Sequence, residues 1–391
     1  MPMTSRDNID ALLRRKPAER VGLWENLWND TYVRWMKEGY PTRKVYKEAG
    51  ESVRNEGDGF VREVEVSGEY DEPVPAWQHF GFDMIGAGGW FDTKPLRGYD
   101  ELVQESDEWE IRRNGAGASF KYWKHKMGTP EHMDFRMATR EIWETQYKPY
   151  LLTFDPERTK IEDTRKNLAE VHAANVWASY GHMFVWELGR GSLGDVTLYS
   201  SLLSDPDWIH DFNRTYTDFY KQYYQYYFDQ VGLPDGVWMY EDMGYNAGLF
   251  ASPRTFEALV FPYFKELIDF FHGYNLPVVL HSCGSVAQIL PQVVQVGFDA
   301  LNPMERKARN NDPYLFAEKY GSQLAFVGGL DVRVLETNDR DTVRREVATF
   351  IDGMKARGAR LVFASDHSVP PTVSYDTYRY ALDVYREHMY Y

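Results

Sequence analysis

Two residues that commonly bind transition metals are separated by one position in the segment LHSCG. His281 and Cys283 are followed by Gly284, and Cys283 is the only cysteine of the chain. Side chains at positions i and i+2 of a strand point to the same face, so both could reach one ion without distorting the backbone. Imidazole and thiolate are ligands that zinc prefers, and a catalytic zinc takes three protein ligands and leaves a fourth position for substrate. The pair therefore predicts a catalytic metal centre, with zinc as the expected ion.

The third ligand must come from another part of the chain. His367 is the leading choice, because it ends the apolar segment RLVFASDH and precedes a stiff Val-Pro-Pro turn that would fix its direction. Asp366, Glu241 and Asp242 are the carboxylate alternatives, and they are also the candidates for general acid or base. The alternative without a metal is a small buried thiol beside a hydrogen-bonded imidazole.

Short apolar runs alternate with longer amphipathic segments from about residue 165 onward. This alternation is typical of strand and helix units that build a parallel sheet. The expected strands are residues 182–187, 236–242, 277–283, 298–303, 324–331 and 360–367. They make up more than half of an eight-stranded barrel, and the segment WQHFGFDMIGAGG can supply the remaining strands.

The sequence therefore predicts a single α/β domain over residues 1–391 that folds as a (β/α)8 TIM barrel. The polar segments at about 40–75 and 95–165 are expected to be irregular insertions at the barrel mouth. An open doubly wound sheet is the alternative. It is less favoured because no glycine-rich phosphate-binding motif follows the first strand.

Polar residues close each expected strand, and in a TIM barrel the chemistry is located where strands end and the following loops begin. We expect these strand ends to meet at one mouth. Glu187, Asn302 and Asp331 are the expected substrate contacts there, together with an aromatic wall that includes Trp24 and Tyr180.

The composition limits the class of partner. With 44 Lys and Arg against 59 Asp and Glu, the formal charge of −15 repels nucleic acid and anionic lipid at long range. A single cysteine fits a reducing cytosol, and no segment reaches the about 20 apolar residues of a membrane span. A cytoplasmic enzyme acting on a small molecule is expected. The tyrosine-rich stretch from Tyr216 has helical spacing and predicts a core or subunit-interface surface, which would allow a homodimer.

Several ordered segments resemble the uroporphyrinogen decarboxylase superfamily, which includes the methylcobamide:coenzyme M methyltransferases and related corrinoid-dependent methyltransferases. The resemblance is carried by TSRDNIDALLRRKPAERVGL, SPRTFEALVFPYFKELID, LPVVLHSCGSVAQILPQVVQVGFDALNP, FVGGLDVRVLETNDRDTVRREVATFID and LVFASDHSVPPTVSYDTYRYALDVYREH. It spans most of the chain and implies a barrel enzyme.

The methyltransferase branch holds zinc with a His-x-Cys pair and a distant cysteine. This chain matches the pair as His281 and Cys283, but it has Asp366-His367 where the branch has Gly-Cys. The resemblance implies a zinc-dependent methyltransferase that moves a methyl group between a small thiol or methoxy substrate and a corrinoid (cobalamin) cofactor carried on a partner protein.

The decarboxylase branch implies a different activity, the cofactor-independent decarboxylation of a tetrapyrrole or aromatic acid. His367 resembles the late histidine of that branch, and Asp83 resembles its pyrrole-binding aspartate. The branch also uses an arginine-rich motif to bind substrate carboxylates, whereas this chain has no arginine between Arg20 and Arg34. A third interpretation is a non-catalytic barrel that binds a corrinoid or a metal.

Overall fold

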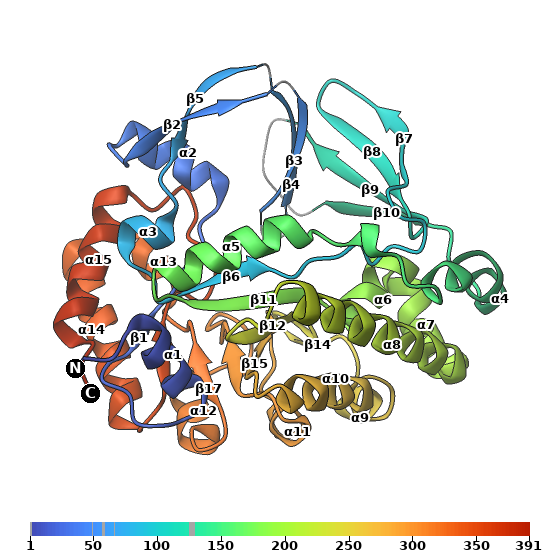
Figure 1. The fold of residues 1–391 in the computed structure, drawn as a ribbon. Coiled ribbons are helices and arrows are strands. Elements are labelled where there is room, and N and C mark those ends of the chain that lie inside the picture. The colour runs from blue at the N-terminus through green and yellow to red at the C-terminus, as the bar shows by residue number, and fades with distance from the viewer. Residues whose placement is uncertain (1, 49, 57–58, 66, 125–129) are drawn as a thin grey trace.

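An eight-stranded parallel sheet forms the centre of the molecule (Figure 1). The computed structural model describes residues 2–48, 50–56, 59–65, 67–124 and 130–391. Neighbours in the sheet follow the order β1-β18-β17-β16-β15-β12-β11-β6. The strands are β1 (Gly22–Leu23), β6 (Met84–Gly88), β11 (Trp177–Met183), β12 (Gly236–Tyr240), β15 (Val278–His281), β16 (Ala300–Asn302), β17 (Ala325–Val327) and β18 (Leu361–Phe363). The predicted TIM-barrel class is confirmed.

Asp83 joins the two edge strands, β1 and β6, at the amino ends of the barrel. Its backbone N–H donates to the carbonyl of Leu23 at 2.8 Å, and its Oδ2 accepts the N–H of Leu23 at 2.8 Å. Arg20 donates to both carboxylate oxygens, at 2.6 and 2.7 Å. Asp83 is 1% exposed. These bonds bring the open edges together and make the sheet a nearly closed barrel.

Apolar side chains fill the barrel interior. Helix α1 (Ser5–Leu13) contributes Ile9, Leu12 and Leu13 to a cluster that also contains one or more residues from seven of the barrel strands, including Trp238. Only the barrel axis can bring residues from so many strands together. Alternate residues of each strand therefore face inward, and the others pack against the surrounding helices.

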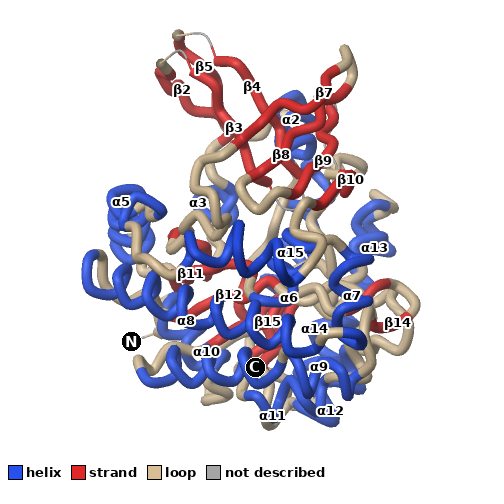
Figure 2. The backbone as a smooth tube through the Cα atoms, turned by 90° about the vertical axis from the view of Figure 1, so that its right-hand side faces the viewer, coloured by secondary structure: helices blue, strands red, loops and turns tan. Residues whose placement is uncertain are grey.

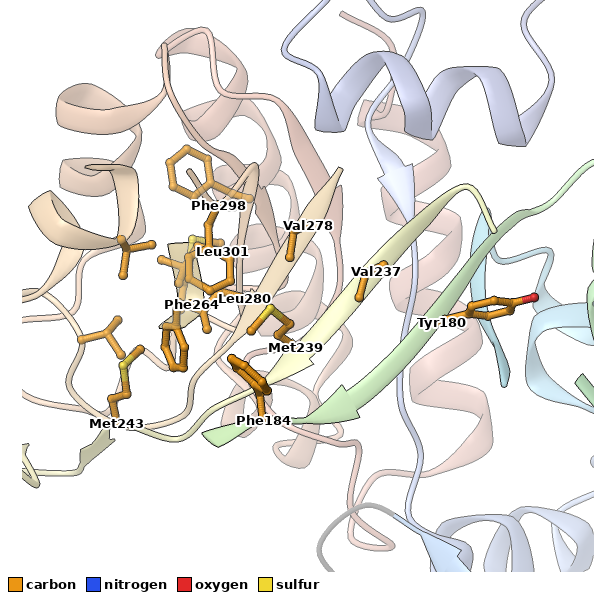
Figure 3. Close-up of a cluster of buried hydrophobic side chains, with 14 of the residues drawn as sticks. Tyr180, Phe184, Val237, Met239, Met243, Phe264, Val278, Leu280, Phe298 and Leu301 are labelled. Carbon is orange, nitrogen blue, oxygen red and sulfur yellow. The ribbon is translucent and has the colours of Figure 1, made fainter. Parts of the chain in front are cut away.

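The outward-facing residues form the larger part of the core. Figure 3 shows Val237 and Met239 of β12 beside Val278 and Leu280 of β15, with Phe264 near them. The covering helices are α5 (Ile161–Ala173), α6 (Val185–Leu193), α7 (Asp195–Ser204), α8 (Pro206–Gln230), α9 (Pro253–Leu259), α10 (Phe261–Gly273), α11 (Leu290–Val296), α12 (Pro313–Tyr320), α13 (Val332–Glu336), α14 (Arg340–Ala356) and α15 (Tyr375–His388).

The aromatic helix α8 is a packing element, as its spacing predicted. Tyr216, Tyr220, Tyr223, Tyr224 and Tyr227 are all buried within this chain. The surface that suggested a homodimer is therefore used inside the molecule. In the described part of the chain, no helix combines the length and the apolar character that crossing a membrane requires.

The expected strand at 182–187 is wrong in its position. The strand β11 occupies Trp177–Met183, and α6 begins at Val185. The reason is the buried carboxylate of Glu241, which accepts the backbone N–H groups of Phe184 and, at 2.8 Å, of Trp186. Helix N-termini leave such N–H groups without intrahelical partners, so a fixed acceptor favours a helix over the strand that the apolar residues indicated.

The two segments expected to be irregular contain antiparallel strands. One holds two antiparallel pairs, β2 (Thr42–Lys47) with β5 (Gly68–Pro73) and, between them in the chain, β3 (Gly50–Glu56) with β4 (Gly59–Glu65). It also carries the flanking helices α2 (Asn29–Lys37) and α3 (Ala76–Phe80). The other forms a four-stranded sheet of β7 (Asp100–Glu105), β8 (Trp109–Asn114), β9 (Ala118–Trp123) and β10 (Glu131–Phe135).

Both insertions follow the carboxyl ends of barrel strands, β1 and β6, and Figure 2 shows them projecting together from one side of the barrel. Strands such as β2, with the sequence TRKVYK, are mostly exposed. Because neither face of such a strand is fully apolar, the alternation of apolar and polar residues that identifies a strand in a sequence is weak here.

Candidate metal centre

The carboxyl ends of four neighbouring strands lie in register. Met183 of β11 pairs with Tyr240 of β12, Tyr240 pairs with His281 of β15, and His281 pairs with Asn302 of β16. Tyr240 is two residues beyond the inward-facing Trp238, so it also faces inward, and Asp242 follows two residues later. The inward-facing side chains of β12 are therefore followed by Asp242, which lies beside His281 and Cys283.

Asp242, His281 and Cys283 form a compact triad at this edge of the barrel. His281 Nε2 lies 3.5 Å from Cys283 Sγ and 3.7 Å from Asp242 Oδ1. One ligand atom from each residue lies within 4.8 Å of those of the other two. The backbone N–H of Cys283 donates to Asp242 Oδ1 at 2.7 Å and so orients the carboxylate. The His281 and Asp242 side chains are 23% and 29% exposed, which leaves the triad accessible to a ligand.

The spacing and donor types of the triad fit zinc. Tetrahedral zinc with ordinary bond lengths separates a sulfur from a nitrogen ligand by about 3.6 Å and a nitrogen from an oxygen ligand by about 3.4 Å. The corresponding distances here are 3.5 and 3.7 Å. If all three side chains bound one zinc ion, the fourth position of a tetrahedral site would stay open, as a catalytic rather than a structural zinc site requires.

Gly284 shapes the loop that follows the pair. It has a positive φ of 74°, a conformation that residues with a Cβ rarely adopt, and an added Cβ would lie 2.4 Å from the carbonyl carbon of Gly244. Its N–H donates to Glu305 at 2.7 Å. The close turn expected from the sequence is therefore present, and it packs against the loop that follows Asp242.

Asn302, expected as a substrate contact, lies behind the triad. Its Oδ1 is 2.6 Å from His281 Nδ1, its Nδ2 donates to the carbonyl of Val327 at 3.1 Å, and it is 0% exposed. The in-register pairing of β15 with β16 places these two side chains next to each other.

His367, the leading third ligand of the sequence analysis, lies outside the triad. It follows β18 and stacks against Trp28, with ring centroids 6.1 Å apart and an interplanar angle of 28°. Its Nδ1 lies 3.5 Å from the carbonyl of Ser368. Among the carboxylates that the sequence offered as alternatives, the structure brings Asp242 to the His281 and Cys283 pair.

Glu241 and Glu187, also expected at the mouth, both form hydrogen bonds with residues of α6. Glu241 is 0% exposed, and burial is the main reason that its pKa is raised well above the usual value, with the nearby Glu187 raising it further. Glu187 lies in the first turn of α6, where Arg190 donates to it at 2.8 Å. In this structure Glu241 caps a helix, and neither residue belongs to the triad.

Asp366 and Asp331 stabilise loops at the carboxyl ends of the strands. Asp366 accepts the backbone N–H of Arg306 at 2.8 Å and of Val332 at 3.0 Å, and burial raises its pKa. Asp331 caps α13 by accepting the N–H of Arg333 at 3.0 Å, and it also pairs with the guanidinium of that residue. The structure therefore gives both carboxylates local backbone partners.

Two expected contacts point in opposite directions. Tyr180 faces outward from β11, where its hydroxyl donates to Gly232 at 3.1 Å, and Figure 3 shows its ring directed away from the labelled side chains of β12 and β15. Because the ring packs between the barrel and α8, Tyr180 does not reach the triad. Trp24 instead packs against Trp238 in the barrel, with ring centroids 4.8 Å apart.

Sequence reasoning missed the aromatic row that continues from Trp24 to the triad. Trp238 lies 6.1 Å from Tyr240, and Tyr240 lies 5.3 Å from His281 and 6.3 Å from Trp90, as measured between ring centroids. The signal was present in the spacing, because Trp238, Tyr240 and Asp242 occupy alternate positions and so share one strand face.

Glu25 was also missed, because β1 is too short to be recognised by its pattern. It is 7% exposed and accepts the backbone N–H and the hydroxyl of Ser365, both at 2.9 Å. Burial is the main cause that raises its pKa to about 8. Glu25 therefore links the carboxyl end of β1 to the loop after β18.

Comparisons with known proteins agree with this architecture. The family model described as Uroporphyrinogen decarboxylase (URO-D) matches residues 183–388, which include the triad. No curated protein sequence matches the chain. A methyltransferase from Methanosarcina mazei has a similar structure, with a TM-score of 0.63 and 14% sequence identity over 98% of this chain and 99% of that chain.

A more distant structural likeness is the intracellular xylanase TsXylA from Thermoanaerobacterium saccharolyticum, with a TM-score of 0.35 and 13% identity over 56% of this chain and 75% of that chain. The likeness to the Methanosarcina mazei protein covers both chains almost completely and shows a shared fold. The family match extends over more than half of the chain. The chain therefore belongs to the uroporphyrinogen decarboxylase family.

Proposed function

We propose that this protein is a zinc-dependent methyltransferase that moves a methyl group between a small thiol or methoxy substrate and a corrinoid carried on a partner protein. The observation that carries the proposal is the triad of Asp242, His281 and Cys283 at the carboxyl ends of the barrel strands. Support also comes from the family and from the whole-chain likeness to a protein described as a methyltransferase.

The three triad residues would hold the ion, and His367 is the remaining alternative for the third ligand. A zinc ion bound there would lower the pKa of a thiol or stabilise a departing alkoxide. In the thiol reaction, the substrate sulfur would take the methyl group from the corrinoid, and the corrinoid would keep the electron pair of the broken carbon–cobalt bond. If His367 were the third ligand, Asp242, whose Oδ1 lies 3.7 Å from His281 Nε2, would be free to accept the thiol proton.

The aromatic row would bind the apolar part of the substrate. Tyr240 lies beside His281, and Trp90, 39% exposed, lies beyond it. Rings in this position would exclude water from one side of the triad and present a flat surface to a small organic group.

The decarboxylase alternative is less well supported by the geometry. Asp83, which would bind the pyrrole, lies at the amino ends of the strands and accepts hydrogen bonds from Arg20 and Leu23. The triad lies at the opposite ends of the strands. Arg20 is likewise held by Asp83 and cannot serve as a carboxylate receptor without breaking that pair.

Methyl transfer from free methylcobalamin to a small thiol tests this proposal. With zinc supplied, the wild-type protein is expected to convert methylcobalamin to cob(I)alamin under anaerobic conditions, as followed by absorbance. Cys283→Ala is expected to lower kcat/KM by at least about 100-fold, which corresponds to about 2.7 kcal/mol of transition-state stabilisation.

His272→Ala is the matched control, because His272 pairs with Asp299 on the outer surface. The reverse reaction, with cob(I)alamin and methoxy compounds as donors, covers the second substrate class. A folded, zinc-loaded protein that binds cobalamin but transfers a methyl group in neither direction would contradict the proposal and favour a non-catalytic corrinoid-binding barrel.

A further inference from the structure

We infer that Asn302 is a positioning residue that fixes the tautomer of His281 and so prepares Nε2 of that ring to bind the metal. This inference rests on the proposed zinc site, and it concerns a residue that would touch neither the ion nor the substrate. Asn302 lies on β16, and its backbone pairs in register with that of His281 on β15.

The orientation of the Asn302 amide follows from its second partner. One end of the amide lies 3.1 Å from the carbonyl oxygen of Val327, which can only accept a hydrogen bond. The amide nitrogen must therefore face Val327. The amide oxygen then faces His281, at 2.6 Å from Nδ1. Because Asn302 is fully buried, water cannot replace either partner.

An amide oxygen only accepts hydrogen bonds, so Nδ1 of His281 must carry a proton. In a neutral imidazole the other nitrogen then has its lone pair free. That nitrogen, Nε2, is the atom that lies 3.5 Å from Cys283 Sγ and 3.7 Å from Asp242 Oδ1. Asn302 thus selects the tautomer in which His281 can donate its lone pair toward the centre of the triad.

The same hydrogen bond limits rotation of the ring. Flipping the imidazole would place a carbon atom against the buried amide oxygen and leave that oxygen without a hydrogen-bond partner, which is unfavourable for a buried polar group. Hydrogen-bond partners behind a metal-binding histidine typically change metal affinity by about 10–100-fold when they are removed. Asn302 is therefore expected to act on affinity while remaining outside the coordination sphere.

The test uses two substitutions of similar size. Asn302→Leu removes the acceptor, and zinc affinity measured by chelator competition is expected to fall by about 10–100-fold. Asn302→Asp keeps an acceptor toward Nδ1 and is expected to bind zinc much more tightly than Asn302→Leu. Asn213→Leu is the matched control. Asn213 lies on α8, away from the triad strands β12 and β15, is also buried, and donates to the carbonyl of Leu259. It is expected to lower stability and leave zinc affinity unchanged.

The tautomer is measured separately in the metal-free protein. Nitrogen NMR of the histidine rings, with His281→Gln used to assign the signal, is expected to show a protonated Nδ1 and an unprotonated Nε2 at pH 8. A protonated Nε2 in the wild-type protein, or wild-type zinc affinity in folded Asn302→Leu, would overturn the inference.

The outcomes separate this inference from the proposed function. If the wild-type protein binds no zinc, the proposed function fails, and the NMR measurement still decides the role of Asn302. If the wild-type protein binds zinc and transfers methyl groups, but Asn302→Leu binds zinc equally well, only the inference fails. If Asn302→Leu does not fold, the tautomer of the wild-type His281 ring and the zinc affinity of Asn302→Asp decide the inference. Loss of zinc binding in a folded Asn302→Asp would contradict the inference.

Discussion

Asp242→Ala is expected to lower zinc affinity by more than the ~10–100-fold that is typical of losing a residue behind the ligands. The substitution removes one of the three atoms that lie within 4.8 Å of one another, and it leaves the backbone N–H of Cys283 without its acceptor. His367→Ala is expected to leave zinc affinity unchanged, because His367 stacks on Trp28 outside the triad. Competition with a zinc chelator measures both effects.

The two variants decide between the two ligand sets. His388→Ala serves as the control, because His388 lies on the surface beside Asp352. A large loss of affinity in His367→Ala, with little change in Asp242→Ala, would show that the site uses the late histidine expected from the sequence and rearranges when the metal binds. Asp242→Asn adds a second test, since it keeps an acceptor for Cys283 but removes the negative charge that favours a cation.

Asp83→Ala is expected to destabilise the barrel by about 3 kcal/mol, without changing zinc affinity. The reason is that the carboxylate is 1% exposed and closes the sheet between β1 and β6, so its removal leaves Arg20 without its carboxylate partner and the N–H of Leu23 without an acceptor. Denaturant unfolding of the variant and the wild type measures the difference.

The exposed pair of Lys44 and Asp71 provides the comparison for this prediction. Its side chains are 65% and 56% exposed, so Asp71→Ala is expected to cost less than about 1 kcal/mol. Wild-type stability in Asp83→Ala, combined with a loss of substrate binding, would contradict the structural role and support the pyrrole-binding role that the decarboxylase branch implies.

The barrel could be predicted because its strands and helices have strong patterns. Strands such as 277–283 and 360–367 are continuous apolar runs that end in polar residues, and their order along the chain implies a parallel sheet. The error at 182–187 arose because Glu241, more than fifty positions away in the sequence, supplies the cap that starts a helix there. Such a long-range partner leaves no mark on the local pattern.

The metal site shows a similar limit. The spacing of His281 and Cys283 predicted a shared strand face, and the structure places their ligand atoms 3.5 Å apart. Which side chain joins them depends on strand order. The strand β12 is the direct neighbour of β15, whereas β18 lies three strands away from β15 in the sheet. The sequence indicated that both Asp242 and His367 end strands, but it could not show that Asp242 ends the adjacent one.

Polar residues at strand ends were also assigned too uniformly to the site. Asp366, Asp331 and Glu241 each accept backbone N–H groups of loops or helix ends. Backbone groups near the ends of strands and helices need partners as much as a substrate does, and the residue types that satisfy them are the same. The two uses differ only in where the side chain lies in the folded protein.

The metal centre is tested by the zinc content of the folded wild-type protein, purified without chelator and dialysed against buffered zinc. About one tightly bound zinc ion per chain is expected. Cobalt substituted for zinc is expected to show a thiolate-to-metal absorption band that is absent in Cys283→Ser. A folded protein that retains no zinc under these conditions, or that binds it equally well without Cys283, would contradict the claim that Asp242, His281 and Cys283 form a catalytic metal centre.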